Sequence, residues 1–178
     1  MLSVLVGHGP LVVVDGERAF GNQRCLPAGP LREPLSRLAS VDAVISNGVI
    51  DCSRLPVESH CMTLTPVHWR HLIDDVRYPA HQLPFSGQVH ALAGIGNPQR
   101  FFRTLTNLGV DHLPCPLADH HRFTPTDLRF SDNLPVVMTA KDAVKCRSFA
   151  NERCWALDVE ARPDQALVDW LAKRLEAL

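Results

Sequence analysis

Short apolar runs alternate with segments whose apolar residues recur at helical spacing along most of the chain. Brief β-branched runs bounded by Gly, Pro, Asp or Asn are typical of buried parallel strands. The pattern predicts strands over 11–15, 41–46, 60–65, 89–93, 110–116, 135–138 and 154–159, and helices over 35–39, 98–108, 125–130, 140–150 and 163–177. Strands that alternate with helices predict an α/β fold, a mainly parallel sheet with helices on both faces.

Residues at the predicted helix ends agree with this pattern. Asn97 precedes Pro98, a pair typical of an N-cap followed by the first helical position, and Gly109 follows the same helix where a left-handed residue is favoured. Thr139 and Asp142 resemble a capping box with Asp in place of Glu. The sequence therefore predicts where these helices begin and end.

Apolar residues also recur along the last predicted helix. Leu167, Trp170, Leu171 and Leu178 fall at helical spacing, with Arg174 among them. Such a stripe is more often part of a core than a surface for a partner. We expect it to pack inside the domain.

Composition narrows the class of protein. The formal net charge is −1, with 46% hydrophobic and 21% charged residues, which is typical of a globular chain without the basic excess of nucleic-acid-binding proteins. The apolar stretches are far shorter than the roughly 20 residues that span a bilayer. The N-terminal 2–6 stretch lacks a basic lead and an h-region, so no secretory signal is expected.

Cysteine and histidine raise the question of a metal site. The six cysteines form no Cys-x-x-Cys pair and are irregularly spaced, so we interpret them as reduced thiols. The alternative is a zinc site from His60, Cys61, His68 and His71, with the last two on one helical face. The paired-ligand spacing of a structural zinc site is not met. We expect ordinary polar surface and no metal site in this chain.

Two motifs lie where strands are expected to lead into helices. Gly94-Ile95-Gly96-Asn97 would let a phosphate or sugar approach the backbone, although a tight turn explains the glycines better on chemistry alone. Lys141, Asp142 and Lys145 follow Thr139 and would meet an anionic ligand, or form a solvated face.

Two further pairs carry reactive groups. The guanidinium of Arg32 can hold two phosphate oxygens at once, although on chemistry alone a surface ion pair in the loop explains the Arg32-Glu33 pair better. Asp119 precedes His120, and a carboxylate beside an imidazole can orient it and adjust its proton affinity.

Four blocks of sequence carry a resemblance to one family. They lie at 12–34 (from Val-Val-Val-Asp-Gly to Leu-Pro-Ala-Gly-Pro-Leu-Arg-Glu-Pro), 93–102 (Ala-Gly-Ile-Gly-Asn-Pro-Gln-Arg-Phe-Phe), 119–121 (Asp-His-His) and 137–146 (Val-Met-Thr-Ala-Lys-Asp-Ala-Val-Lys-Cys). From residue 11 onward the chain resembles the second half of tetraacyldisaccharide 4'-kinase, the bacterial enzyme that phosphorylates a lipid A precursor. Residues 1–10 do not resemble the family.

The resemblance assigns roles to these residues. It implies that His120 is catalytic together with Asp119, and that His120 works with an acid from the N-terminal half to activate the sugar hydroxyl. It places Arg32 and Glu33 at the active site, and implies that the substrate and phosphate contacts are Gly94, Gly96, Asn97, Lys141, Asp142 and Lys145. His121 is a variable position and is expected to be exposed. Ala140 departs from the Glu that is usual in the family.

The chain does not contain the family's phosphate-binding motifs. Its lysines, Lys141, Lys145 and Lys173, follow Ala or Val rather than the Gly of a P-loop, and the motif Asp-Asp-Gly-x-Gln-His is absent. The fold is thus interpreted as P-loop-kinase-related with its N-terminal nucleotide-binding half missing. Residues 1–50 are expected to be a remnant of that core, with exposed strand edges, and 51–178 a C-terminal α/β domain.

By resemblance, the full enzyme transfers the ATP γ-phosphate to the 4'-hydroxyl of tetraacyldisaccharide 1-phosphate. It uses magnesium and works in the cytoplasm, peripheral to the inner membrane of a Gram-negative bacterium. This chain alone is expected to be inactive. Alternatives are a non-catalytic module that binds an acylated sugar phosphate, half of a split kinase that needs a separate N-terminal half, or a decayed or misread gene. Residues 1–10 favour a frameshift or wrong start.

Overall fold

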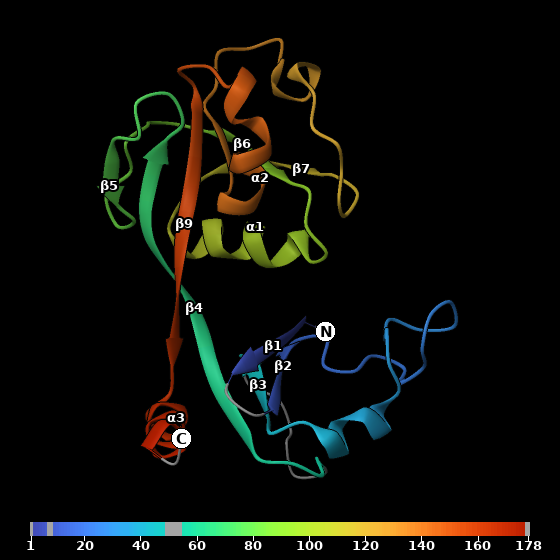
Figure 1. Ribbon diagram of the computed structural model, residues 1–178. Helices are drawn as coiled ribbons and strands as arrows, with labels where there is room; N and C mark the ends of the chain where they lie inside the picture. The colour runs from blue at the N-terminus through green and yellow to red at the C-terminus, as the bar shows by residue number, and fades with distance from the viewer. Residues whose placement is uncertain (1, 7–8, 49–54, 177–178) are drawn as a thin grey trace. The chain divides into compact units, whose positions relative to one another are not determined.

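The structure is a computed structural model that describes residues 2–6, 9–48 and 55–176. Contacts divide it into two compact units, unit 1 with Met1–Leu64 and Ala161–Leu178, and unit 2 with Thr65–Glu160. The neighbouring strands β4 (Ser59–His71) and β9 (Cys154–Pro163) contribute residues to both units (Figure 1). The expected boundary at residue 50 falls within 49–54, outside the described residues.

The sheet of unit 1 has the strand order β1-β2-β3-β4. Its elements are β1 (Leu2–Val6), β2 (Gly9–Asp15), a 3-10 helix (Leu35–Ser40), β3 (Ala43–Asn47), the first residues of β4, and α3 (Gln165–Glu176). β2, β3 and β4 are parallel, and β1 is antiparallel to β2. The strands and helices predicted for this part of the chain are confirmed within a few residues.

Apolar residues cover both faces of β2 and β3, as expected for parallel strands. Val12 and Val44 pack with Leu38 of the 3-10 helix on one face. Leu11 and Ala43 pack with the α3 stripe on the other, where Leu167 is buried. The core role predicted for the last helix is confirmed there, whereas Leu178 lies outside the described residues.

The edge of β2 that does not contact β3 is covered, contrary to the expectation of an exposed edge. β1 pairs with it over five residues, from Leu2 opposite Val13 to Val6 opposite Gly9. The expectation was wrong because residues 2–6, which show no family resemblance, themselves form a strand.

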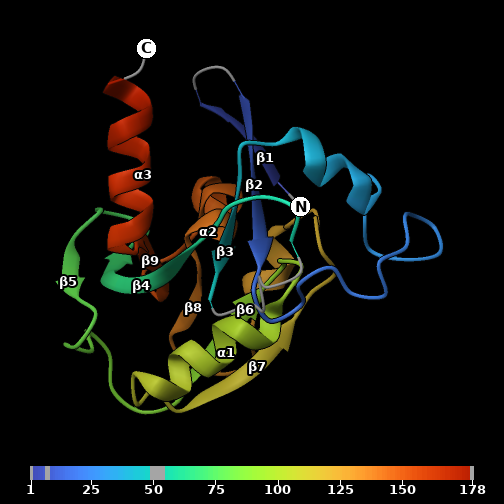
Figure 2. The same cartoon turned by 90° about the horizontal axis from the view of Figure 1, so that it is seen from below.

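Unit 2 has a mainly parallel sheet with the order β5-β4-β9-β8-β6-β7 (Figure 2). Its further elements are β5 (Arg77–Pro79), β6 (Val89–Ala93), α1 (Pro98–Asn107), β7 (His112–Pro116), a 3-10 helix (Pro125–Leu128), β8 (Val136–Thr139), α2 (Ala140–Cys146) and a 3-10 helix (Arg147–Phe149). β7, β6, β8 and β9 are parallel neighbours, whereas β5 is antiparallel to β4. The predicted α/β fold with a mostly parallel sheet is confirmed.

The two helices of unit 2 cover opposite faces of its sheet. Side chains alternate between faces along a strand, so Ala91 and Leu92 of β6 point to opposite sides. Ala91 packs with Phe102 of α1, and Leu92 with Ala143 of α2. Helices on both faces, as the sequence predicts, are thus found in unit 2.

β4 is much longer than the predicted 60–65 strand, and it contains Pro66. Proline cannot donate a hydrogen bond to a sheet ladder, so a strand is not expected to continue through Pro66. In the structure β3 pairs with Ser59–Met62 and β5 with His68–Arg70, so Pro66 falls between the two ladders. β9 likewise extends beyond the predicted 154–159.

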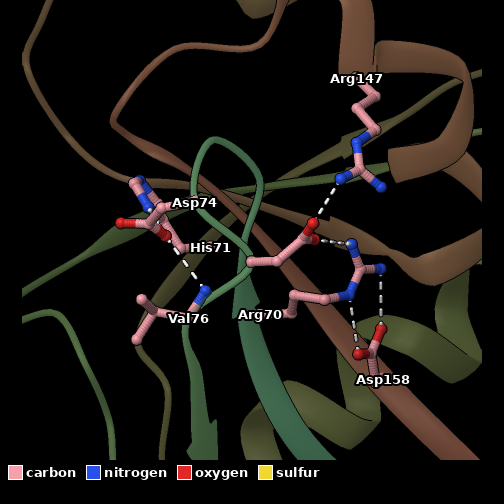
Figure 3. A network of polar contacts seen from close by, with 7 residues as sticks. Arg70, His71, Asp74, Val76, Arg147 and Asp158 are labelled. Carbon is pink, nitrogen blue, oxygen red and sulfur yellow. Dashed lines mark hydrogen bonds and ion pairs between the residues drawn. The ribbon is translucent and has the colours of Figure 1, made fainter.

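Arg70 of β4 joins several elements of unit 2 (Figure 3). Its Nε and Nη2 donate to the two carboxylate oxygens of Asp158 at 2.9 and 3.0 Å. The same guanidinium lies 3.6 Å from Asp75, which also contacts Arg147. Hydrogen bonding with Asp158 raises the pKa of Arg70 despite its partial burial, so the guanidinium stays charged and the bidentate ion pair links β4 to β9.

Candidate functional site

The carboxyl ends of β6, β7 and β8 lie at one edge of unit 2, because these strands are parallel neighbours. β6 leads into α1 on one face of the sheet, and β8 leads into α2 on the other. Adjacent strands whose connections leave on opposite faces form a topological switch point, the usual ligand site of open α/β sheets. We call this the switch-point edge. Most of the predicted site residues lie there.

Asp142 joins the two sides of the switch-point edge. Its side chain is fully buried. Oδ2 accepts hydrogen bonds from the Gly94 N–H at 3.0 Å and the Thr139 hydroxyl at 2.8 Å, and Oδ1 accepts from Lys145 Nζ at 3.1 Å. One buried carboxylate therefore holds the loop after β6, the end of β8 and a cation of α2 together.

The predicted capping pair is confirmed in part. Thr139 Oγ1 accepts the N–H of Asp142 at 3.2 Å, as an N-cap should. In the reciprocal bond of a capping box the backbone N–H of Thr139 would donate to the Asp142 carboxylate, whereas here the Gly94 N–H donates to it. The Asp142 carboxylate is thus occupied by protein groups, which suits a positioning role better than direct substrate contact.

Gly94 and Gly96 differ in their surroundings. Gly94 is buried, and a Cβ there would lie 3.1 Å from the ring of Phe123, so its lack of a side chain lets the aromatic ring pack. Gly96 is exposed, and Asn97 occupies the N-cap position of α1. A ligand would therefore meet the loop at Gly96 and Asn97 rather than at Gly94.

Two lysines bring positive charge to this edge. Lys145 Nζ lies 5.1 Å from the ring centroid of Phe123, in addition to its bond to Asp142, and its side chain is 30% exposed. Lys141 is more exposed and its Nζ lies 3.8 Å from Asp119 Oδ1. The contact of Lys141 with Asp119 links the start of α2 to the loop that follows β7.

Asp119 and His120 lie together in that loop. The backbone N–H of His120 donates to Asp119 Oδ1 at 3.0 Å, and His120 Nε2 lies 3.6 Å from Asp119 Oδ2. His120 has a left-handed φ of 62° and its side chain is 72% exposed. The imidazole is therefore presented to solvent beside a carboxylate, as a group that exchanges protons with a ligand must be.

His121 is half-buried, contrary to the expectation that it is exposed. Its Nε2 lies 3.2 Å from Asp127, and its ring meets Phe123 edge-on. Burial raises the pKa of Asp127, but hydrogen bonds from Thr124 and the contact with His121 outweigh it, and the pKa is lowered overall. The Thr124-x-x-Asp127 capping box is the sequence signal for this structural role, because it brings Asp127 back toward the loop.

Arg32 and Glu33 belong to unit 1 and are not among the residues that unit 2 brings together. Both are exposed. Glu33 Oε2 accepts from Arg37 Nε at 3.1 Å, one helical turn away, so the ion pair considered for Glu33 forms with Arg37. Glu33 thus has a partner within its own unit, and Arg32 is exposed at the end of its loop.

The loop before Arg32 has a fixed shape. Leu31 is buried and exchanges backbone hydrogen bonds with Leu26 and Arg24. A Cβ at Gly29 would lie 2.1 Å from Asn22 Oδ1, so only glycine fits there. Arg32 therefore follows a rigid anchor rather than a free linker.

The structure does not place His68 and His71 on a helix, as the zinc alternative supposed. His68 and His71 lie on β4, so they do not share a helical face. Within the described residues, no group of three or more His, Cys, Asp or Glu side chains is arranged to hold a metal ion. Cys25, Cys61, Cys115, Cys146 and Cys154 are free thiols, as predicted, and Cys52 lies outside the described residues.

No described helix is both long and apolar enough to cross a membrane. The peripheral association with a membrane that the resemblance implies stays a prediction.

The family model of tetraacyldisaccharide-1-P 4'-kinase (LpxK) matches residues 9–176. This chain belongs to that family. Curated LpxK relatives from Ectopseudomonas mendocina, Azotobacter vinelandii and Pseudomonas aeruginosa are each 49% identical over 168 residues. These matches cover 94% of this chain and 50% of each relative, so the chain spans about half the length of the LpxK proteins it matches.

A solved structure supports the fold. The crystal structure of LpxK from Aquifex aeolicus in complex with ATP matches 92% of this chain and 51% of its own, with a TM-score of 0.62 and 22% sequence identity. The α/β arrangement described above is therefore that of part of an LpxK kinase. The family is one of ATP-binding kinases of lipid A biosynthesis.

Proposed function

We propose that this chain supplies the C-terminal part of a tetraacyldisaccharide 4'-kinase. The reaction is transfer of the γ-phosphate of ATP to the 4'-hydroxyl of tetraacyldisaccharide 1-phosphate, in the cytoplasm and peripheral to the inner membrane. The observation that carries the proposal is the family match over residues 9–176, which includes every candidate site residue. The switch-point edge supports it, because the candidate groups of unit 2 converge where α/β proteins bind ligands.

His120 is the proposed catalytic base. As the sugar oxygen attacks the γ-phosphorus, the bond from phosphorus to the β,γ-bridging oxygen breaks and ADP leaves. The imidazole takes the hydroxyl proton together with the acid that the resemblance places in the N-terminal half, and Asp119, 3.6 Å from Nε2, lies where it can orient the ring. The exposure of His120 supports this role, because the acceptor hydroxyl must reach the ring.

The remaining residues position the reactants and neutralise charge. These two effects dominate the catalysis of phosphoryl transfer. The ammonium groups of Lys141 and Lys145 add positive charge near the transferred group, and Gly96 and Asn97 offer the start of α1 to the substrate. Asp142 fixes Lys145 and the loop after β6. In unit 1, Arg32 is proposed to grip phosphate oxygens and Glu33 to hold the loop through Arg37.

ATP and magnesium supply the phosphoryl donor and its charge neutralisation. The sequence has no P-loop lysine and no paired-aspartate motif. These groups must come from the half of the family's length that this chain does not span. A polypeptide of these 178 residues is therefore expected to show no turnover by itself.

A mixing experiment tests the proposal. The 178-residue chain, the half of the Pseudomonas aeruginosa relative that it does not match, and the two co-expressed are assayed for ATP-dependent phosphorylation of tetraacyldisaccharide 1-phosphate. We expect product only from the co-expressed pair. Turnover by the chain alone would contradict the need for a second half. A complex that binds the lipid equally with and without ATP and makes no product would favour a binding module instead.

A further inference from the structure

β1 differs from the rest of unit 1 in its relation to the family. The family match begins at residue 9, the first residue of β2, so all of β1 lies outside it. Nevertheless β1 pairs with β2 along Gly9–Val13. A segment foreign to the family is thus hydrogen-bonded to the first family strand.

The burial of β2 is that of an interior strand. Val12 and Val14 are buried on one face and Leu11 on the other. Strands covered on both faces are typical of the middle of a parallel sheet, where each edge is paired. β3 pairs with one edge of β2 in parallel from Leu11 to Asp15. The other edge is where a family strand is expected, and the relatives are twice as long as this chain.

We propose that β1 is a surrogate strand, which occupies the edge of β2 that the other half of the kinase pairs with. This inference rests on the proposed function. An unpaired strand edge presents open N–H and C=O groups and attracts other strands, so a covering strand keeps the chain from aggregating. Because β1 and the incoming strand use the same backbone groups of β2, β1 must leave before the other half docks.

The test removes the pairing capacity of β1 alone. Successive N–H groups of a strand point to opposite sides, so the double variant Ser3→Pro/Val4→Pro removes the N–H that faces β2 whichever residue carries it. Ser3→Thr/Val4→Thr is the matched control, because threonine keeps the N–H and favours strands. Circular dichroism checks whether both variants remain folded.

Two measurements follow. In hydrogen exchange on the isolated chain, β2 amides of the proline variant should exchange at least tenfold faster than those of the wild type and of the threonine control. In co-expression with the unmatched half of the Pseudomonas aeruginosa relative, the proline variant should capture at least tenfold more of that half. Equal exchange, or equal capture including none by either, would overturn the proposal.

Kinase assay of the captured complex separates this inference from the proposed function. Stronger capture by the proline variant without phosphorylation would support the surrogate strand and contradict the proposed kinase function. Should the proline variant unfold, the deletion of residues 2–6 repeats both measurements with the same expected and contradicting results.

Discussion

The functional edge of unit 2 is held by residues of that unit, whereas unit 1 is completed by a strand outside the family match and by the last helix of the chain. In unit 2 the buried Asp142 joins Gly94 and Lys145 within one stretch of chain. In unit 1 the strand edge is covered by β1, which lies outside the family match, and one face by α3 from the other end of the chain. The two units thus differ in how they are held together, unit 2 by a buried carboxylate and unit 1 by β1 and α3.

The attachment of α3 shows how such a piece is held. Asp164 accepts the backbone N–H groups of Cys61 at 3.0 Å and Leu167 at 2.7 Å, so it caps α3 and ties it to β4. Trp170 Nε1 donates to Glu58 at 2.9 Å, and Arg174 pairs with Asp42. These contacts are few and mostly at the surface, unlike the buried carboxylate of unit 2.

The largest expected effect is that of Asp142→Ala on unit 2. The change leaves the buried Gly94 N–H and Thr139 hydroxyl without an acceptor and Lys145 without its counter-charge. We expect a loss of about 3 kcal/mol in the free energy of unfolding, measured with urea. Val144→Ala, on the exposed side of the same helix, is the control and should cost less than about 0.5 kcal/mol. A loss below about 1 kcal/mol for Asp142→Ala would show that the contacts of Asp142 contribute little to the stability of unit 2.

A smaller effect is expected from Asp164→Ala in unit 1. Loss of an N-cap carboxylate typically costs about 1 kcal/mol. Because α3 is an attached piece, its amides should lose protection from hydrogen exchange while those of unit 2 keep theirs. Asp169→Ala, farther along the same helix, serves as the control. Equal loss of protection from hydrogen exchange in both units would show that the effect of Asp164 is not confined to α3.

Acid should release α3 through the same carboxylate. Hydrogen bonds from the Leu167 and Cys61 backbones lower the pKa of Asp164 below its usual 3.8. A lowered pKa stabilises the fold above the unfolded value, and that contribution is lost as pH falls below about 4 through the folded value. We expect Trp170 fluorescence to report a small destabilisation there in a Trp69→Phe/Trp155→Phe background, and Asp164→Asn to remove this dependence. An unchanged acid profile in the asparagine variant would contradict the assignment.

The smallest expected effect concerns thiol reactivity. Burial, with the nearby Asp142 charge, raises the pKa of Cys146 to about 12, so little thiolate exists at pH 8. Cys25 of unit 1 is half-exposed. Mass spectrometry after brief alkylation should show modification at Cys25 and none at Cys146 or at buried Cys154. Rapid alkylation of Cys146 would mean that unit 2 opens more easily than its contacts indicate.

Much of this architecture follows from local sequence signals. Gly109, predicted to end α1 in a left-handed conformation, has a φ of 75°. The strands around the switch-point edge are short runs bounded by turn residues, and the sequence predicts their ends to within two residues. Such signals act over a few residues, so one sequence suffices to find them.

Other features depend on contacts between distant residues. The sequence predicts too short a strand for β4, because proline normally interrupts a strand. Pro66 is tolerated because β3 and β5 pair with β4 on either side of it. The role of Asp142 as a buried link to Gly94 needs the pairing of β6 with β8, which no local pattern contains. The burial of His121 depends in the same way on the return of Asp127 toward its loop.

The role of His120 is tested most directly by the rate of phosphate transfer in the reconstituted pair with His120→Ala. We expect kcat to fall at least about 100-fold, as on loss of a general base, with normal binding of the two halves. His81→Ala, an exposed histidine of the same unit, should leave kcat unchanged. Full activity of the His120→Ala enzyme would contradict the placement of the catalytic base at the switch-point edge.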